Sequence, residues 1–110
     1  LSGGTGNDTI SGGSGDEVIV GGHGNDVMSG GAGSDTFKFG LGDDYARDVI
    51  LDFVKGQDKI EFSGANNFNY WNLDITYVDS SAHVKFTNTD IELRGIAANE
   101  LDASDFDFTV

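Results

Sequence analysis

The chain has 110 residues and carries 19 acidic residues against 6 Lys and Arg, a net charge of −13. This excess of carboxylates excludes a nucleic-acid surface, which needs clustered Lys and Arg, and disfavours docking on an anionic membrane. With 17 Gly and no Cys, the chain has neither disulfides nor thiolate metal ligands. No run approaches the roughly 18 apolar residues of a membrane helix, so we expect no membrane insertion. The length suits one small domain. The excess of acidic residues indicates that the chain binds cations.

The first third of the chain is a nine-residue repeat. Residues 1–36 hold 12 of the 17 glycines and contain no Lys, Arg or aromatic residue. Written in nines, residues 3–38 read GGTGNDTIS, GGSGDEVIV, GGHGNDVMS and GGAGSDTFK, and a degraded copy, FGLGDD, follows at 39–44. The sixth position is always acidic. The eighth is always large and apolar: Ile10, Ile19, Met28 and Phe37. A flexible acidic linker would not keep this register.

Each repeat combines a turn with a very short strand. Three glycines in six residues allow positive φ and close backbone approach, and the apolar side chain then faces inward. One unit cannot bury that side chain alone, so consecutive units must coil. If two repeats make one turn of the coil, Asp8 stacks on Asp26, Glu17 on Asp35, and Asp26 on Asp44. Stacked carboxylates repel unless a cation separates them, and carboxylate and carbonyl oxygens suit Ca²⁺ rather than Zn²⁺.

This pattern resembles the GGxGxDxUx repeat of the RTX (repeats-in-toxin) family. The resemblance implies an all-β fold: a right-handed parallel β-roll over residues 1–44 and a β-strand cap over 45–110, in one continuous domain. It also implies about two to four Ca²⁺ ions held between turns by loop carbonyls and acidic side chains. The implied ligand residues are Gly3, Gly4, Gly6, Asp8, Gly13, Gly15, Glu17, Gly21, Gly22, Gly24, Asp26, Gly31, Gly33, Asp35, Gly40, Gly42 and Asp44. Glu17 departs from the motif, and its longer side chain weakens the site with Asp35 or moves it onto Asp16.

Short alternating runs in the second half predict a meander of strands. Val49, Leu51 and Phe53 alternate with other residues, residues 55–57 form a turn, and Ile60 and Phe62 then face inward. Further alternating runs follow between residues 73 and 93, and only 97–101 could form a helical turn. We expect residues 63–72 to form a loop. This apolar half would cap the open end of the coil.

The second half carries resemblances of its own. Residues 48–62 match D-x-I-x-D-F-x-x-G-x-D-x-I-x-F, similar to the C-terminal region of serralysin-type proteases and to R-modules of mannuronan epimerases. The ending resembles that of type I secreted proteins, and its last residues, Asp107, Phe108, Thr109 and Val110, resemble their export signal. The resemblance implies that the chain leaves a Gram-negative cell unfolded through an ABC transporter and folds outside.

We therefore expect a monomeric, extracellular domain that binds calcium, folds with it and directs type I secretion. It has no His-Glu-x-x-His, Gly-x-Ser-x-Gly or phosphate-loop motif, so we expect no catalysis by the domain itself. A larger secreted enzyme (protease, epimerase or lipase) or an adhesin could carry it. The alternative is an R-module that binds a polysaccharide such as alginate and modulates an attached epimerase.

Several residues of the second half have two interpretations. We expect Asp48, Asp52 and Asp58 to be solvated, the alternative being a further Ca²⁺ at the junction of roll and cap. The isolated His23 and His83 make no zinc site.

The aromatic side chains of Phe68, Tyr70 and Trp71 are expected in the cap core, the alternative being a sugar-stacking patch. We expect Arg47, Lys55 and Lys59 to pair with neighbouring acids, the alternative being a groove for a polyuronate chain.

Overall fold

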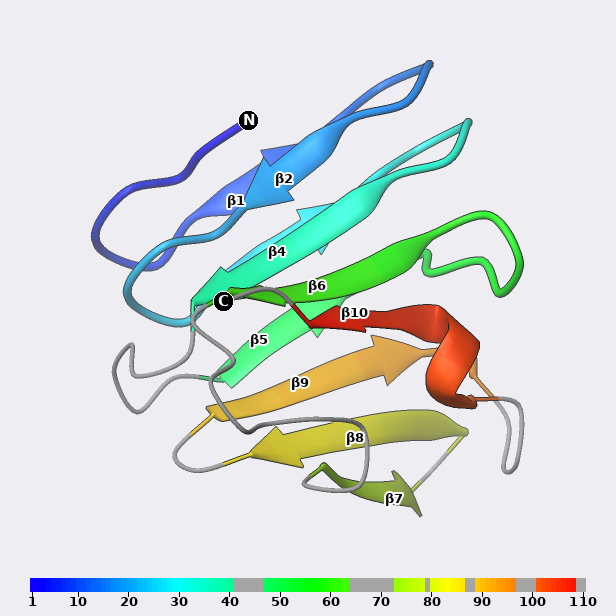
Figure 1. The fold of residues 1–110 in the computed structure, drawn as a ribbon. Helices are drawn as coiled ribbons and strands as arrows, with labels where there is room; N and C mark the ends of the chain where they lie inside the picture. The colour runs from blue at the N-terminus through cyan, green and yellow to red at the C-terminus, as the bar shows by residue number, and fades with distance from the viewer. Residues whose placement is uncertain (41–46, 64–72, 79, 87–88, 97–100, 109–110) are drawn as a thin grey trace.

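The computed structural model describes residues 1–40, 47–63, 73–78, 80–86, 89–96 and 101–108. Over these ranges the fold is built from strands and one short 3-10 turn, arranged in two layers (Figure 1). The elements are β1 (Thr9–Ser11), β2 (Val18–Val20), β3 (Val27–Ser29), β4 (Thr36–Gly40), β5 (Arg47–Ile50), β6 (Lys59–Ser63), β7 (Asp74–Val78), β8 (Ser81–Phe86), β9 (Thr89–Arg94), η2 (Ala103–Asp105) and β10 (Phe106–Phe108). No helix in these ranges is long or apolar enough to cross a membrane.

The repeats wind back and forth between the two layers. Strands β1, β3 and β5 lie side by side in one sheet, and β2, β4 and β6 in the other, all in parallel pairs. Ile10 is in register with Met28, and Ile19 with Phe37, so one turn of the coil spans 18 residues. The prediction of two repeats per turn is confirmed.

The coil continues past the repeats with a longer step. Val27 pairs with Val49 and Thr36 with Lys59, so the turns ending in β5 and β6 span 22 and 23 residues. Asp48 therefore lies in the place below Asp26. The expected stacking of Asp26 on Asp44 is wrong, because the additional residues shift the register, and Asp44 itself lies outside the described residues.

The predicted meander is correct only for its later strands. Strands β7, β8 and β9 pair antiparallel, and β9 joins β5 in parallel. Strands β5 and β6 do not form the expected hairpin, because residues 51–58 carry the chain across to the other sheet (Figure 1). The side-chain phase of β5 also differs, since Asp48 and Ile50 are buried whereas Leu51 is 40% exposed.

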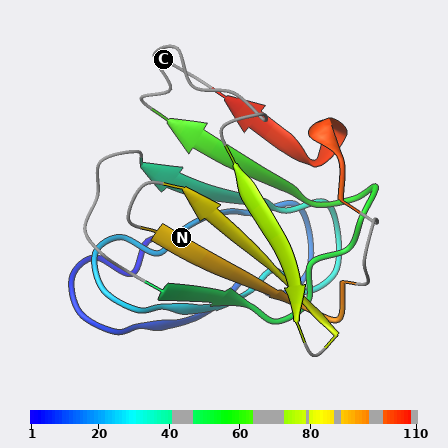
Figure 2. The same cartoon turned by 90° about the horizontal axis from the view of Figure 1, so that it is seen from below.

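The core fills the space between the layers. The eighth-position residues Ile19, Met28 and Phe37 are fully buried, whereas Ile10 at the open end is only partly buried. In the view of Figure 2, β10 runs beside β6, where Phe62 stacks on Phe106 and Phe108 at centroid distances of 6.1 and 5.4 Å. This packing fixes the end of the coil and leaves the glycine-rich turns along its edges.

Candidate metal centre

The glycine-rich turns stack closely along each edge of the coil. The second and fourth positions of every repeat have positive φ, for example 86° at Gly22 and 99° at Gly24. A Cβ at Gly22 would overlap the carbonyl oxygen of Gly4, and one at Gly24 that of Gly6. The absence of side chains thus lets the carbonyls of one turn approach the backbone of the next.

The sixth-position acids form a hydrogen-bonded ladder. The amide of Asp8 donates to Asp26 Oδ1 and that of Glu17 to Asp35 Oδ1, each at 2.9 Å. The structure thus brings together both acidic pairs predicted within the four full repeats. The ladder continues at the same distance from Asp26 to Asp48 and from Asp35 to Asp58.

Three of these acids also have a buried carboxylate oxygen that accepts no hydrogen bond from the described residues. Asp8 Oδ2, Glu17 Oε1 and Asp35 Oδ2 are inaccessible to solvent and accept no hydrogen bond within the described part of the chain. Each lies against the first glycine of its own repeat: a Cβ at Gly3 would be 2.7 Å from Asp8 Oδ2, and one at Gly12 would be 2.9 Å from Glu17 Oε1. Buried carboxylate oxygens without a partner are costly, which is the condition that a cation relieves.

The surroundings of these oxygens match a hard cation. A Cβ at Gly3 would also lie 2.7 Å from the carbonyl oxygen of Gly21 in the next turn, so carbonyl and carboxylate oxygens share one space. The pKa of Glu17 is raised, mainly because the side chain is partly buried and to a smaller extent because the negative charge of Asp35 is near. Among the described residues no three His, Asp or Glu side chains converge. A cation here would therefore take several ligands from backbone carbonyls, as Ca²⁺ readily does.

A second ladder was not anticipated from the sequence. The side chain at the fifth position of a repeat accepts a hydrogen bond from a backbone N–H of the next turn. The amide of Asn25 donates to Asn7 Oδ1 at 2.8 Å, that of Ser34 to Asp16 Oδ1 at 2.7 Å, and that of Arg47 to Asn25 Oδ1 at 2.8 Å. One oxygen of Asp16 is thereby engaged in holding two turns together. The recurrence of Asn or Asp at this position in three consecutive repeats was the available signal.

The acids following the repeats are not solvated, contrary to expectation. Asp48 and Asp58 are only 4% and 2% exposed. Asp52 is partly buried and accepts hydrogen bonds from Ser29 Oγ at 2.8 Å and from the amides of Gly30 and Gly31 at 3.0 and 2.9 Å. The expectation failed because it took these residues for turn and strand-face positions, whereas Asp48 and Asp58 continue the ladder and Asp52 binds the start of the 30–35 turn. Burial raises the pKa of Asp58, although amide hydrogen bonds oppose the shift.

Lys55 and Lys59 pair with acids as predicted. Lys55 Nζ lies 2.9 Å from Asp105 and 3.2 Å from Asp102, and Lys59 Nζ lies 3.7 Å from Asp107. The hydrogen bond to Asp105 is the main cause of a raised pKa of Lys55. These contacts tie residues 55–59 to η2 and β10.

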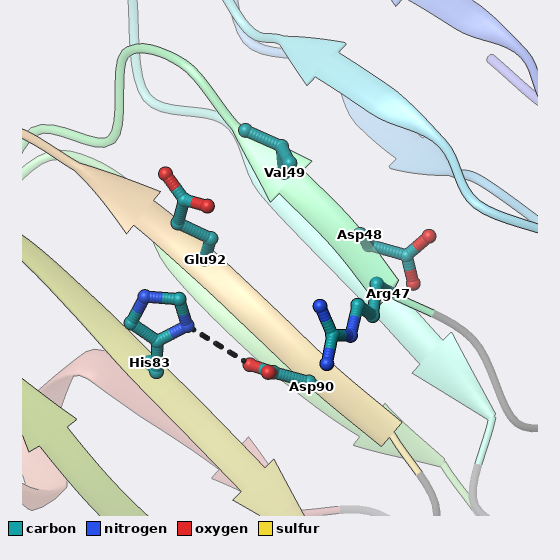
Figure 3. A pocket seen from close by; sticks show the side chains of 6 residues that line it. All are labelled: Arg47, Asp48, Val49, His83, Asp90 and Glu92. Carbon is teal, nitrogen blue, oxygen red and sulfur yellow. Dashed lines mark hydrogen bonds and ion pairs between the residues drawn. The ribbon is translucent and has the colours of Figure 1, made fainter.

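A small hollow lies over β5, β8 and β9. Its volume is about 100 Å³, and Figure 3 shows its lining: Arg47, Asp48, Val49, His83, Asp90 and Glu92. His83 lies on β8, and its Nδ1 is 3.3 Å from Asp90 Oδ1 on β9. The lining mixes both signs of charge and is no basic groove for a polyuronate.

The other predicted site residues are only partly visible. Asp107 and Phe108 belong to β10, which pairs with β6, whereas Thr109 and Val110 lie outside the described residues. Also outside are Gly42 and Asp44, the aromatic residues 68, 70 and 71, and most of the expected helical turn at 97–101.

Comparisons with known proteins agree with this architecture. The family described as Peptidase M10 serralysin C terminal matches residues 1–108. The AlgE6R3 subunit of a mannuronan C5-epimerase from Azotobacter vinelandii is similar in structure, with 26% identity and a TM-score of 0.69, covering 96% of this chain and 80% of that one. The extracellular lipase LipA from Serratia marcescens shares the fold at 21% identity and a TM-score of 0.65, covering 92% of this chain and 19% of that one. No curated protein matches.

This chain spans about a fifth of that lipase, so the shared part is one portion of a larger protein there. The all-β, R-module-like architecture and the match over residues 1–108 agree with each other. The chain belongs to the family of serralysin C-terminal domains of peptidase M10.

Proposed function

We propose that this chain is a calcium-binding domain of an extracellular bacterial protein, and that it folds when it binds Ca²⁺. The observation that carries the proposal is the set of buried carboxylate oxygens, on Asp8, Glu17 and Asp35, that accept no hydrogen bond within the described part of the chain. They lie between glycine turns in a segment, residues 1–36, that contains no Lys or Arg. A hard divalent cation supplies the missing positive charge.

The ligands would come from two stacked turns at a time. One site lies between the turns 3–8 and 21–26 and uses Asp8 and Asp26, and a second lies between 12–17 and 30–35 and uses Glu17 and Asp35. Backbone carbonyls of the same glycine turns complete each site. The coil that presents them is then a β-roll, and we assign it the right hand that nearly all parallel crossover connections take.

Coupling of folding to calcium follows from the energetics of the repeats. Glycine loses more conformational freedom on ordering than any other residue, and the repeats bury only one large side chain each. A site filled at ten times its dissociation constant adds about 1.4 kcal/mol to the stability of the folded state. Extracellular calcium modules have dissociation constants on the order of 10⁻⁴–10⁻³ M. Such sites stay empty in a cytosol poor in free calcium and fill outside the cell.

We further propose that the domain serves type I export, with residues 107–110 as the signal read by the ABC transporter. The support is the family membership and the resemblance of the last residues to export signals of this class. The domain performs no chemistry itself in this proposal and acts as a monomeric accessory to the protein that carries it.

Calcium-dependent folding is tested by circular dichroism and thermal unfolding in EDTA and in millimolar Ca²⁺. The proposal expects Ca²⁺ to raise the melting temperature, and Asp8→Asn to weaken Ca²⁺ binding by about tenfold or more. The matched control is Asp74→Asn, which removes an equal charge from an exposed position on β7. Identical spectra and melting in both buffers would refute the coupling.

The likeness to an epimerase R-subunit favours one alternative, binding of alginate. Because Asp48, Asp90 and Glu92 share the lining of the small hollow with Arg47 and His83, alginate could contact this hollow only with Ca²⁺ bridging its carboxylates to those of the protein. Titration with alginate oligomers, followed by NMR of the Arg47 and His83 side chains, tests it. Unchanged shifts in the presence of Ca²⁺ would exclude this alternative.

A further inference from the structure

Three chain segments stack along one edge of the coil, and the last differs from the other two. The first two are the glycine turns 12–17 and 30–35, and the third is residues 51–58. The third segment contains one glycine, Gly56, where each repeat has three, and a Cβ there would meet nothing within 4 Å. By contrast, a Cβ at Gly31 would overlap the carbonyl oxygen of Gly13 in the turn above. The close carbonyl stacking therefore ends before the third segment.

Hydrogen-bond donors, rather than carbonyl oxygens, engage Asp52 in the interval between the second and third segments. Both amides at the start of the second turn point towards it: Gly30 donates to Asp52 Oδ1 at 3.0 Å and Gly31 to Asp52 Oδ2 at 2.9 Å. Ser29 Oγ also donates to Asp52 Oδ2, at 2.8 Å. Three convergent donors create a local environment for an anion, which the carboxylate fills, and they would repel a metal ion.

Asp58 completes the same interval. Its Oδ1 accepts the amide of Asp35 and its Oδ2 accepts the amide of Val54, at 2.9 and 2.8 Å. All four carboxylate oxygens of Asp52 and Asp58 thus accept hydrogen bonds, whereas Asp8, Glu17 and Asp35 each keep a buried oxygen with no such bond in the described residues. The third segment needs no cation to satisfy its acids.

The third segment is also held from the other side. Phe53 is 5% exposed and its ring lies 6.4 Å from that of Phe37. Lys55 bonds to Asp105, which is 3% exposed. These contacts fix residues 51–58 to β4 and to the C-terminal η2 turn without the help of the glycine turns.

We infer that residues 51–58 form a cation-free end-stop on this edge, in which the carboxylates of Asp52 and Asp58 take the place of a metal ion. The inference rests on the proposed calcium sites for its contrast with the turns above. Its consequence is that the 30–35 turn is ordered in the absence of calcium, and serves as the template on which the 12–17 turn closes when Ca²⁺ arrives.

Amide hydrogen exchange of the full chain in EDTA tests the end-stop directly. The amides of Gly30, Gly31, Asp35 and Val54 should be protected at least about tenfold more than those of Gly12 and Gly13, and the difference should shrink on addition of Ca²⁺. Equal lack of protection in both groups would overturn the inference. A wild-type chain that binds no Ca²⁺ yet keeps this pattern would refute the proposed function and leave the end-stop standing.

A variant separates the end-stop from a calcium site. Asp52→Asn should lower the melting temperature by about 10 °C in EDTA as well as in Ca²⁺, because it weakens charge-assisted hydrogen bonds. The number of calcium ions bound per chain, measured by equilibrium dialysis, should stay as in the wild type. Loss of one ion from Asp52→Asn, with Asp74→Asn unchanged, would show that Asp52 is a ligand and overturn the inference.

Discussion

Replacing Gly22 by Ala tests whether the turns touch as closely as the structure shows. Gly4 is the matched control, because both glycines hold the second position of a repeat with nearly equal φ, 85° at Gly4 and 86° at Gly22. A Cβ at Gly4 would meet nothing within 4 Å, whereas one at Gly22 would overlap the carbonyl oxygen of Gly4. The two variants thus share their backbone strain and differ in the collision alone.

The magnitudes follow from these contacts. Left-handed backbone costs Ala about 1–2 kcal/mol, and the stiffer unfolded chain returns about 0.4–1 kcal/mol, so Gly4→Ala should lose about 1 kcal/mol. Gly22→Ala must also separate two turns, which weakens the hydrogen bonds from His23 to Gly4 and from Asn25 to Asn7, at 3.0 and 2.8 Å. At about 1 kcal/mol each, these bring its loss to about 3 kcal/mol.

Urea unfolding in millimolar Ca²⁺ measures both losses on the same scale. The expected difference of about 2 kcal/mol is a factor of about thirty in the ratio of folded to unfolded chains. A second pair repeats the comparison, because Gly13 is open whereas Gly31 faces the Gly13 carbonyl. If the open and the facing glycine of each pair lost the same stability, the close stacking of the turns would be wrong.

Three further predictions address the other features of the molecule. Glu17→Asp restores the common acid of the repeat and should tighten calcium binding several-fold in isothermal titration; weaker binding would show that the longer side chain suits its site. Lys55→Met removes the ion pairs of Lys55 with Asp105 and Asp102. Because folding raises the pKa of Lys55, these pairs stabilise the protein at any pH below the ordinary Lys pKa, and the stabilisation is lost as the pH rises through the pKa of the folded state. The difference in melting temperature between variant and wild type should be constant at roughly pH 5–9 and disappear in stronger alkali, and a difference that persists there would contradict the role of these ion pairs. Met28→Ala should cost about 2–5 kcal/mol in urea unfolding because Met28 is fully buried, whereas Val18→Ala, at 53% exposure, should cost well under 1 kcal/mol.

The periodic part of the chain was predictable because one rule repeats. Once the eighth position is apolar in every unit, a core of Ile19, Met28 and Phe37 follows, and two units per turn then stack Asp8 on Asp26. Beyond residue 38 the rule loses its constant spacing. The next turn of the coil spans 22 residues, from Asp26 to Asp48. Nothing in the local sequence distinguishes Asp48 from Asp44 as the acid that binds the Asp26 amide.

The errors in the second half share a physical origin. Alternation of Val49, Leu51 and Phe53 indicates a strand but not which face is inward, and the inward positions proved to be Asp48 and Ile50. Hairpin rules apply to neighbouring strands, whereas β5 and β6 find their partners in earlier turns of the coil.

The unequal steps of the coil have a consequence for how such chains can vary. Successive turns on the two edges span 18, then 22 or 23 residues, yet the amide-to-carboxylate bond measures 2.9 Å at each of them. Alignment is therefore set by the acid at the start of each strand, directly before β3 and β6 and within the first two residues of β5, and not by the number of residues between acids. Extra residues can accumulate before such an acid without disturbing the strands that follow it. A peptide tag inserted at such a point would add length to the chain and leave the packing of the next turn intact.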